Sequence, residues 1–237
     1  MGGGTGTGVA PLIASLAREH GALTIGVATS PFDFEGQRRA EQAEYGLQEL
    51  RENTDAVIAI PNQRLLDTVD GEPSTSEAFR MSDETLLLGI KTVADIIVES
   101  GEINVDFADV ESIMKDAGTV LMGVGQASGE NRARVAMENA ITSPLLDGKQ
   151  IGGATGIIVQ ISAPPDFMMN ELDASMNVLQ DEAFDAQIIF GLVYRDDAPE
   201  PNDTVIVSIL ANGVEPQHGS TTPLSTQKSD TLSLIHI

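Results

Sequence analysis

Gly2-Gly-Gly-Thr-Gly-Thr-Gly8 opens the chain and runs directly into Val9-Ala-Pro-Leu-Ile-Ala-Ser-Leu-Ala-Arg-Glu19, a segment with the apolar spacing of a helix. Five glycines in these seven positions permit positive φ angles and a close approach of the backbone to a ligand. Pro11 suits the first turn of the helix, where its missing N–H costs nothing. A glycine-rich loop that enters a helix N-terminus binds anions, because free N–H groups and the positive end of the helix dipole meet there. The stretch predicts a phosphate site; the alternative is a tight turn without a ligand.

Two common phosphate-binding motifs do not fit this loop. A P-loop requires Gly-Lys-Ser/Thr, which does not follow here. If Gly4 and Gly6 were the first two glycines of a dinucleotide fingerprint, the third position would be Val9. The next apolar run then ends at Thr29-Ser-Pro31, without an acidic residue to bind a ribose. The phosphate site therefore belongs to another class.

Apolar runs and polar helical segments alternate along the first hundred residues. Buried strands are expected at 22–28 and 56–60, with a helix over 36–53 between them, an order that favours a parallel α/β sheet. A long helix is expected over 77–99, and Ser76 or Ser82 is a candidate cap. A short helix ends near residue 115.

The pattern changes at Thr119-Val-Leu-Met-Gly-Val-Gly125 and predicts a small α+β layer. The elements expected there are helices at 130–142 and 171–182 and strands at 156–161, 186–194 and 204–210. The last two strands are expected to form a hairpin through 196–203. From residue 214 the chain is polar and predicted to be disordered, and 232–237 reads as a translated sequencing adapter.

The chain of 237 residues has 36 acidic and 13 basic residues, a formal net charge of −23. Such a charge disfavours nucleic acid and anionic membranes as direct partners. An acidic excess also fits adaptation to a salty cytoplasm, where screening relieves the self-repulsion. The absence of cysteine excludes disulfides and thiolate chemistry. We find no signal peptide and no apolar run long enough to span a bilayer, and no spacing of His or Asp suggests a zinc site.

The first eight residues resemble the tubulin signature of FtsZ, the family of tubulin-like GTPases of prokaryotic cell division. Three further stretches agree with that family in order and spacing: Pro31-Phe-Asp-Phe-Glu-Gly-Gln-Arg-Arg39, Ile60-Pro-Asn-Gln-Arg-Leu-Leu66 and Asn104-Val-Asp-Phe-Ala-Asp-Val110. The resemblance extends from Met1 to about Gly213. FtsZ proteins carry the first half of the GTPase domain, with another glycine-rich loop, ahead of this point. The resemblance therefore implies an N-terminally truncated chain.

A tubulin-like α/β fold in successive parts follows from the resemblance. Residues 1–100 would be the C-terminal half of a parallel-sheet GTPase domain that includes the long core helix over 77–99. Residues 101–118 would be a catalytic loop with a short helix, and 119–213 an α+β C-terminal domain.

The resemblance also implies a set of residues that bind GTP or GDP, with Mg²⁺ accompanying the nucleotide. Glu35 and Arg39 would contact the ribose and phosphate region, although at i,i+4 spacing they also fit a solvated ion pair. Phe79 and Asp83 would flank the guanine, although they also fit a core aromatic and an acid favoured by the helix dipole. The implied nucleotide-binding residues are Gly3, Gly4, Thr5, Gly6, Thr7, Thr29, Glu35, Arg39, Phe79 and Asp83.

Asn104, Asp106 and Asp109 are the implied catalytic residues. In FtsZ this loop points into the GTP site of the next subunit, so that hydrolysis requires a head-to-tail contact, which generates filaments. From the residues alone, Asp106 is equally a helix N-cap and Asp109 a first-turn acid.

By resemblance, the function is a GTP-hydrolysing, self-assembling protein of the cytoplasmic mid-cell division ring. Its partners would be copies of itself, and membrane-anchor and division proteins that bind a tail absent from this chain. Three alternatives remain: a CetZ-like cell-shape GTPase, a non-enzymatic assembly or capping module, and an unrelated phosphate-binding α/β enzyme. Because half of the implied site is missing, we expect the chain alone to bind GTP poorly.

Overall fold

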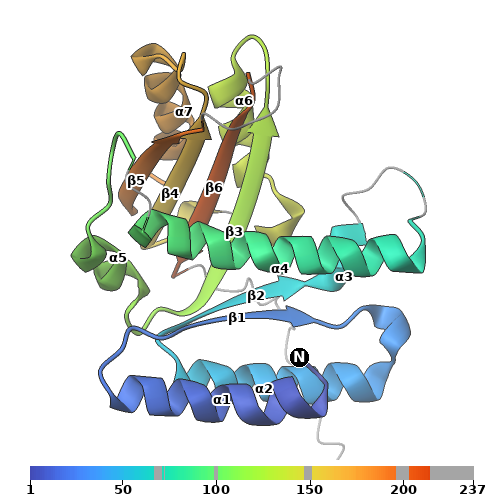
Figure 1. The fold of residues 1–237 in the computed structure, drawn as a ribbon. Helices are drawn as coiled ribbons and strands as arrows, with labels where there is room; N and C mark the ends of the chain where they lie inside the picture. Colours follow the sequence, from blue (N-terminus) through green and yellow to red (C-terminus); the bar gives the residue numbers. More distant parts are fainter. Residues whose placement is uncertain (67–70, 72, 99–100, 147–150, 196–202, 214–237) are drawn as a thin grey trace, which may run out of the picture.

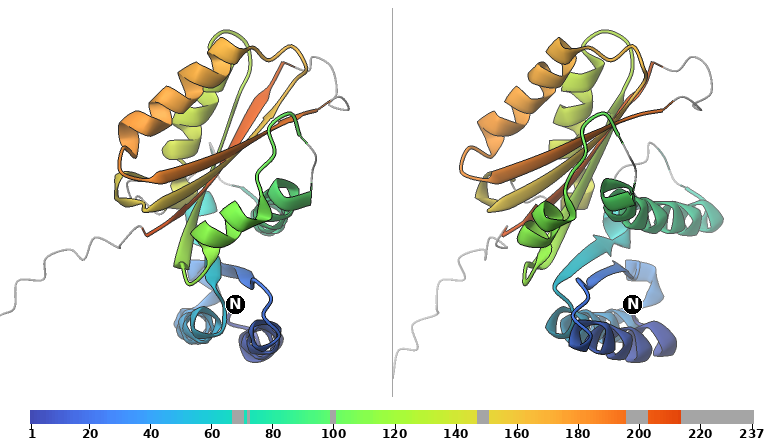
Figure 2. Two further views of the ribbon diagram at one scale, coloured as in Figure 1. Left: turned by 90° about the vertical axis from the view of Figure 1, so that its left-hand side faces the viewer. Right: turned by 60° about the vertical axis from the view of Figure 1, so that its left-hand side comes forward.

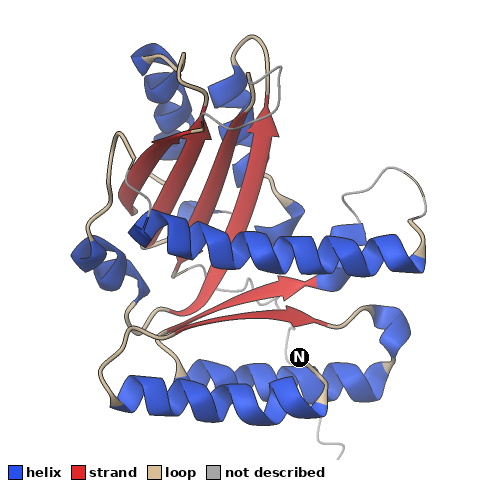
Figure 3. Ribbon diagram, viewed as in Figure 1, coloured by secondary structure: helices blue, strands red, loops and turns tan. Residues whose placement is uncertain are grey.

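The structure is a computed structural model that describes residues 1–66, 71, 73–98, 101–146, 151–195 and 203–213. Its strands form one six-stranded mixed sheet in the order β1-β2-β3-β6-β4-β5, with helices on both faces (Figures 1 and 3). The predicted α/β fold class is confirmed. The predictions of a disordered tail over 214–237 and of an adapter-like end at 232–237 concern residues outside those that the structure describes.

The first part of the chain supplies two parallel strands and four helices. β1 (Ile25–Ser30) pairs with β2 (Ala56–Pro61) in register from Ile25↔Ala56 to Ser30↔Pro61. α1 (Gly4–Glu19) and α2 (Gln37–Asn53) cover one face of this pair, and α4 (Thr75–Val98) covers the other (Figure 1). The short helix α3 (Asn62–Leu66) follows β2 directly, and the 3₁₀ turn η1 (Asp33–Glu35) precedes α2. Both predicted strands and both longer predicted helices after the glycine stretch are confirmed, with small shifts of their ends.

α1 begins inside the glycine stretch, not after it. Gly3 is the N-cap, with an extended backbone, and the helix includes the following glycines. Pro11 consequently lies inside the helix, so the prediction that it occupies the first turn is wrong. The glycine that the backbone requires is Gly2, whose φ is +94°, and where a Cβ would lie 2.7 Å from the carbonyl oxygen of Arg39.

The cap of α4 is Ser74, and neither Ser76 nor Ser82 has that role. The Ser74 hydroxyl accepts a hydrogen bond from Glu77 N at 3.3 Å, and Glu77 Oε2 accepts from Ser74 N at 2.8 Å. This reciprocal pair is a capping box. Ser82 is buried within the helix and donates its hydroxyl hydrogen to Asn62 Oδ1 at 2.8 Å.

β3 joins the two parts of the sheet. After α5 (Phe107–Met114), the long strand β3 (Gly118–Ala127) pairs in parallel with the start of β2, where Ala56 lies opposite Gly118. Farther along, it pairs antiparallel with β6 (Val205–Asn212), from Val120↔Asn212 to Ala127↔Val205. The sheet is therefore continuous across the predicted boundary at 101–118, and the division into domains stays a prediction.

The remaining strands show that the predicted hairpin between the last two is wrong. β4 (Gly156–Ala163) lies between β5 (Gln187–Tyr194) and β6, parallel to β5 and antiparallel to β6. The difference follows from burial. Six of the eight residues of β6 are buried, as a central strand requires, whereas only two of the eight residues of β5 are buried, which suits an edge strand. Residues 196–202 of the connection lie outside the described residues.

Three clusters of buried side chains lie between the sheet and its helices. One lies under α6 (Arg132–Ile141) and α7 (Met169–Glu182), one under α4 and α5, and a smaller one under α1 and α2. Short 3₁₀ turns, η2 (Pro144–Leu146) and η3 (Ile151–Gly153), close the connection between α6 and β4. Among the described residues, no helix is both long and apolar enough to cross a membrane.

Candidate functional site

The glycine end of α1 lies against the carboxyl end of β1. The amino group of Met1 donates to the carbonyl oxygen of Thr29 at 2.6 Å, and burial, followed by the charge of Arg39, lowers the pKa of that amino group. The Gly2 N–H donates to Thr7 Oγ1 at 3.0 Å. Gly3, Gly4, Thr5 and Gly6 are exposed. The structure thus brings Thr29 and the glycine stretch together and leaves the first turn of α1 open to a ligand.

Glu35 and Arg39 meet beside this stretch. Arg39 Nε lies 3.0 Å from Glu35 Oε2, and Glu35 Oε1 accepts a hydrogen bond from Phe32 N at 2.9 Å. The Glu35 side chain is 9% exposed and that of Arg39 53%, so the carboxylate is shielded while the guanidinium is open to solvent. The arrangement is more than a solvated pair, because Glu35 also shapes the turn that leads into α2.

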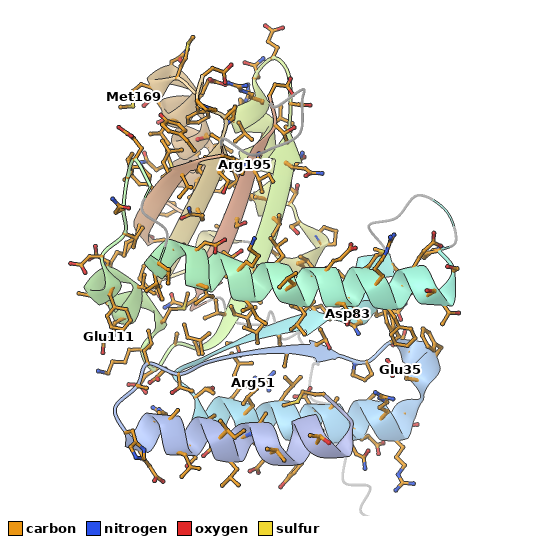
Figure 4. The ribbon with its side chains drawn as sticks, in the orientation of Figure 1. Glu35, Arg51, Asp83, Glu111, Met169 and Arg195 are labelled. Carbon is orange, nitrogen blue, oxygen red and sulfur yellow. The ribbon has the colours of Figure 1, made fainter. Side chains whose placement is uncertain are left out.

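An aromatic cluster joins this turn to α4. The rings of Phe32 and Phe34 stack with centroids 5.2 Å apart, and Phe79 meets Phe32 and Phe34 edge-on at 5.5 and 6.0 Å. Phe32 is buried, whereas Phe34 and Phe79 are exposed. Asp83 is exposed one turn after Phe79, and Figure 4 shows it at the same end of the molecule as Glu35. Of this cluster only Phe79 was predicted; Phe32 and Phe34 were missed, although they flank Asp33 in a quoted motif.

A cavity of about 590 Å³ lies between α1 and α2. Its lining combines the first turns of α1 with one side of α2, namely Gly3, Gly4, Thr7, Gly8, Arg38, Glu41, Gln42 and Tyr45. Glu35, Phe79 and Asp83 do not line it. The predicted nucleotide residues therefore gather at one end of the molecule, and of them Gly3, Gly4 and Thr7 line this cavity.

The predicted catalytic residues lie at the other end of α4. Asn104 Oδ1 accepts a hydrogen bond from Gly101 N at 2.7 Å, and Asp106 accepts from Ala108 N at 3.3 Å as the N-cap of α5. Asp109 is an exposed first-turn acid. Figure 4 shows α5, marked by Glu111, opposite the end that carries Asp83. From Asp83 to Val98, the last residue of α4, there are 15 residues, so about 22 Å of helix separates Asp83 from the end of α4 that leads toward this loop.

The structure confirms that Asp106 is the N-cap of α5. A catalytic role for this residue stays a prediction. In the described part of the chain, no group of three or more His, Cys, Asp or Glu side chains could hold a metal ion.

Two family models match the chain. The GTPase domain of the Tubulin/FtsZ family matches residues 1–70, and the C-terminal domain of the FtsZ family matches residues 118–215. The chain is 44% identical over 216 residues to "Cell division protein FtsZ 2" of Rhizobium meliloti, covering 91% of this chain and 62% of that protein.

The fold is similar to a solved structure titled "FtsZ dimer, empty" from M. jannaschii, with a TM-score of 0.85 and 37% identity over 91% of this chain and 62% of that one. CetZ1 from Haloferax volcanii, solved as a GDP-bound monomer, shares the fold with a TM-score of 0.73 at 19% identity, over 90% of this chain and 62% of that one. The chain thus spans about three fifths of the length of these relatives. It belongs to the FtsZ family of tubulin-like proteins.

Proposed function

We propose that this chain serves in a GTP-binding, GTP-hydrolysing protein that assembles head-to-tail into filaments of the cytoplasmic, mid-cell division ring. The observation that carries the proposal is the placement of the two site groups toward opposite ends of α4, with about 22 Å of helix between Asp83 and the last residue, Val98. Asn104, Asp106 and Asp109 cannot reach a nucleotide bound at the glycine end of their own chain. In a head-to-tail pair, however, the loop of one subunit meets the nucleotide end of the next.

The chemistry assigned to each group follows from its surroundings. The exposed N–H groups at the start of α1 favour a phosphate, and the open guanidinium of Arg39 adds positive charge beside them. The exposed rings of Phe34 and Phe79 offer a face for a base, and Asp83 can accept the two hydrogens that guanine presents. Mg²⁺ would accompany the phosphates. Asp106 and Asp109 from the neighbour would orient water, since phosphoryl transfer depends mainly on positioning and electrostatics.

The nucleotide end offers a surface on which the remaining part of a GTPase domain can pack. β1 is the last strand of the sheet, so one side of its backbone has no strand partner among the described residues. α1 and α4 lie on either side of this edge (Figure 2). Val9, Leu12, Ile13 and Leu16 form an apolar stripe on α1 with exposures between 45% and 62%, and Leu87 and Ile90 are exposed on α4. We propose that the part of the relatives not covered by this chain packs here and completes the site.

The same open edge supports a second candidate function. A chain with a complete acidic loop and an incomplete nucleotide end could add to a filament and block further growth, as a non-enzymatic capping module. A CetZ-like role has less support, because the identity to CetZ1 is 19% against 37% to the FtsZ dimer structure. Membrane-anchor and other division proteins stay proposed partners.

A loop-complementation assay tests the proposed function. The assay mixes this chain with a variant of Rhizobium meliloti FtsZ 2 that carries Asn at the position aligned with Asp109. This variant keeps its own GTP sites but lacks a working acidic loop. Added wild-type chain should restore phosphate release, whereas chain with Asp109→Asn should bind the filaments without restoring it. A capping module would instead shorten filaments, seen by light scattering, with no gain in phosphate release. Wild-type chain that neither associates nor activates would contradict both functions.

A further inference from the structure

The loop that carries the acidic residues pairs with the edge strand β5. Ile103 N donates to the carbonyl oxygen of Leu192 at 3.3 Å, and Leu192 N donates to that of Ile103 at 3.0 Å, an isolated antiparallel bridge. Along the loop Ile103 and Val105 are half-buried, whereas Asn104 and Asp106 are exposed. Because alternate side chains of an extended segment face opposite sides, this bridge decides which side the two polar residues face.

The buried side of the loop packs onto two different parts of the core. Ile103 packs against the cluster under α6 and α7, and Val105 packs against the cluster under α4 and α5. Leu192 is only 4% exposed although β5 is an edge strand. The loop is therefore seated on the sheet by both backbone and side chains.

Two glycines allow this close seating. A Cβ on Gly101 would overlap the carbonyl oxygen of Leu192 and lie 2.9 Å from Val193 Cγ2. A Cβ on Gly191 would lie 2.7 Å from Gln160 Oε1 and 3.3 Å from Val105 Cγ2. Neither glycine has a positive φ, so the requirement is space and not backbone conformation. Gly101 meets rigid backbone, while Gly191 meets mainly the movable end of a side chain.

We propose that β5 positions the acidic loop for hydrolysis, and that Gly101 and Gly191 are the positioning residues that let the loop seat there. The inference rests on the proposed function, in which Asn104, Asp106 and Asp109 act on the nucleotide of a neighbouring subunit. A displacement of about 1 Å in such a positioned group can cost about a hundredfold in rate. The glycines themselves need not touch the nucleotide.

Three alanine variants of this chain test the inference in the loop-complementation assay. Gly101→Ala should lower the maximal rate of restored phosphate release by about tenfold or more. Gly191→Ala should lower it less, because Gln160 can move aside. Gly153→Ala is the matched control, since nothing lies within 4 Å of a Cβ there, and it should activate like wild type.

Hydrogen exchange of the chain alone supplies a second readout that does not depend on GTP. The Leu192 amide should be protected in wild type and in Gly153→Ala, and should exchange at least about tenfold faster in Gly101→Ala. The amides of Ile158 and Ile209 in the central strands should keep their protection, which would show that the change is local. A merely destabilising substitution would lower protection throughout the sheet.

The outcomes separate the two proposals. If Gly101→Ala activates like wild type while Asp109→Asn does not, the positioning role is wrong and the proposed function stands. An unprotected Leu192 amide in wild type would also overturn the positioning role. If Asp109→Asn activates as well as wild type, the proposed function fails whatever the glycine variants do.

Discussion

Asp106 and Asp109 lie three residues apart, yet their surroundings differ. Asp106 accepts a hydrogen bond from Ala108 N, whereas Asp109 is exposed in the first turn of α5. Asp106→Ala should lower the free energy of unfolding by about 0.5–2 kcal/mol, because the cap is lost. Asp106→Asn should keep stability, since Asn is an equally good cap, but should lower activation in the loop-complementation assay because the charge is gone. Urea unfolding of both variants checks the first part. Full activation by Asp106→Asn would leave Asp106 with a capping role only.

The two threonines of the glycine stretch also differ. Thr7 Oγ1 accepts a hydrogen bond from Gly2 N, while Thr5 is exposed. Thr7→Val should lower the free energy of unfolding by about 1 kcal/mol, because the Gly2 N–H loses its partner. Thr5→Val, with the same change of shape, should leave stability unchanged and weaken GTP or GDP binding by about 1–3 kcal/mol once the site is completed. If Thr5→Val bound nucleotide as tightly as wild type, Thr5 would have no role in binding the phosphates.

At the scale of elements, local periodicity predicted most helices and strands, but it could not predict which strands are neighbours. β3 was not recognised as a strand because Gly123 and Gly125 weaken its apolar alternation. The structure explains these glycines, because a Cβ on either would overlap a backbone carbonyl oxygen of α6. The predicted hairpin between β5 and β6 failed for a related reason. Which strand occupies the centre depends on the whole sheet, and short-range turn signals carry no information about it.

Arg132 of α6 is a buried arginine whose ion pairs with Glu171 of α7 and with Asp166 the sequence did not reveal. Arg132, whose side chain is 8% exposed, places its Nε 2.8 Å from Glu171 Oε1 and donates to the carbonyl oxygen of Asp203 at 3.1 Å. The hydrogen bond from Arg132 lowers the pKa of Glu171 below its ordinary value of 4.5. This pair therefore contributes its full stability above pH 4.5, and the contribution is lost as the pH falls through the lowered pKa of the folded state.

Glu171→Gln should lower the free energy of unfolding at pH 7 by about 1–2 kcal/mol, because a charge-assisted hydrogen bond becomes a neutral one. The difference from wild type should shrink as the pH falls below 4.5, where the unfolded carboxyl is protonated. Glu182→Gln, at an exposed position of the same helix, is the matched control and should follow wild type at every pH. Urea unfolding at several pH values measures this. A difference that stays constant with pH would mean that packing, not charge, accounts for the loss.

At the scale of the whole molecule, the sequence motifs identified candidate residues but not their arrangement. Phe34 and Phe32 were missed because a short aromatic repeat in a turn does not reveal that it will meet Phe79 on a distant helix. The separation of Asp109 from the glycine stretch depends on how α4 crosses the sheet. That path follows from burial of its apolar side against β2 and β3, which is a long-range property.

An exposed apolar stripe on α1 lies beside the open edge of β1. In a chain with a net charge of −23, the stripe Val9, Leu12, Ile13 and Leu16 has no packing partner within the described structure. Parallel strands are normally paired and covered on both faces. We therefore expect the part of Rhizobium meliloti FtsZ 2 that its match to this chain does not cover to bind here as a separate polypeptide, in a 1:1 complex seen by analytical ultracentrifugation.

Two variants of exposed apolar residues test where the added segment binds. Leu12→Glu, at a position 62% exposed, should leave the fold intact but abolish the complex, because a charge would be buried without a partner. Met169→Glu, at 76% exposure on α7, introduces the same charge away from this surface and should not affect the complex. A second measurement concerns GTP. Calorimetric titration should find weak GTP binding for the chain alone and much tighter binding for the complex. Tight binding by the chain alone would contradict the incomplete-site interpretation. A 1:1 complex that forms equally well with Leu12→Glu would mean that the added segment docks elsewhere, because the charge would then remain in water.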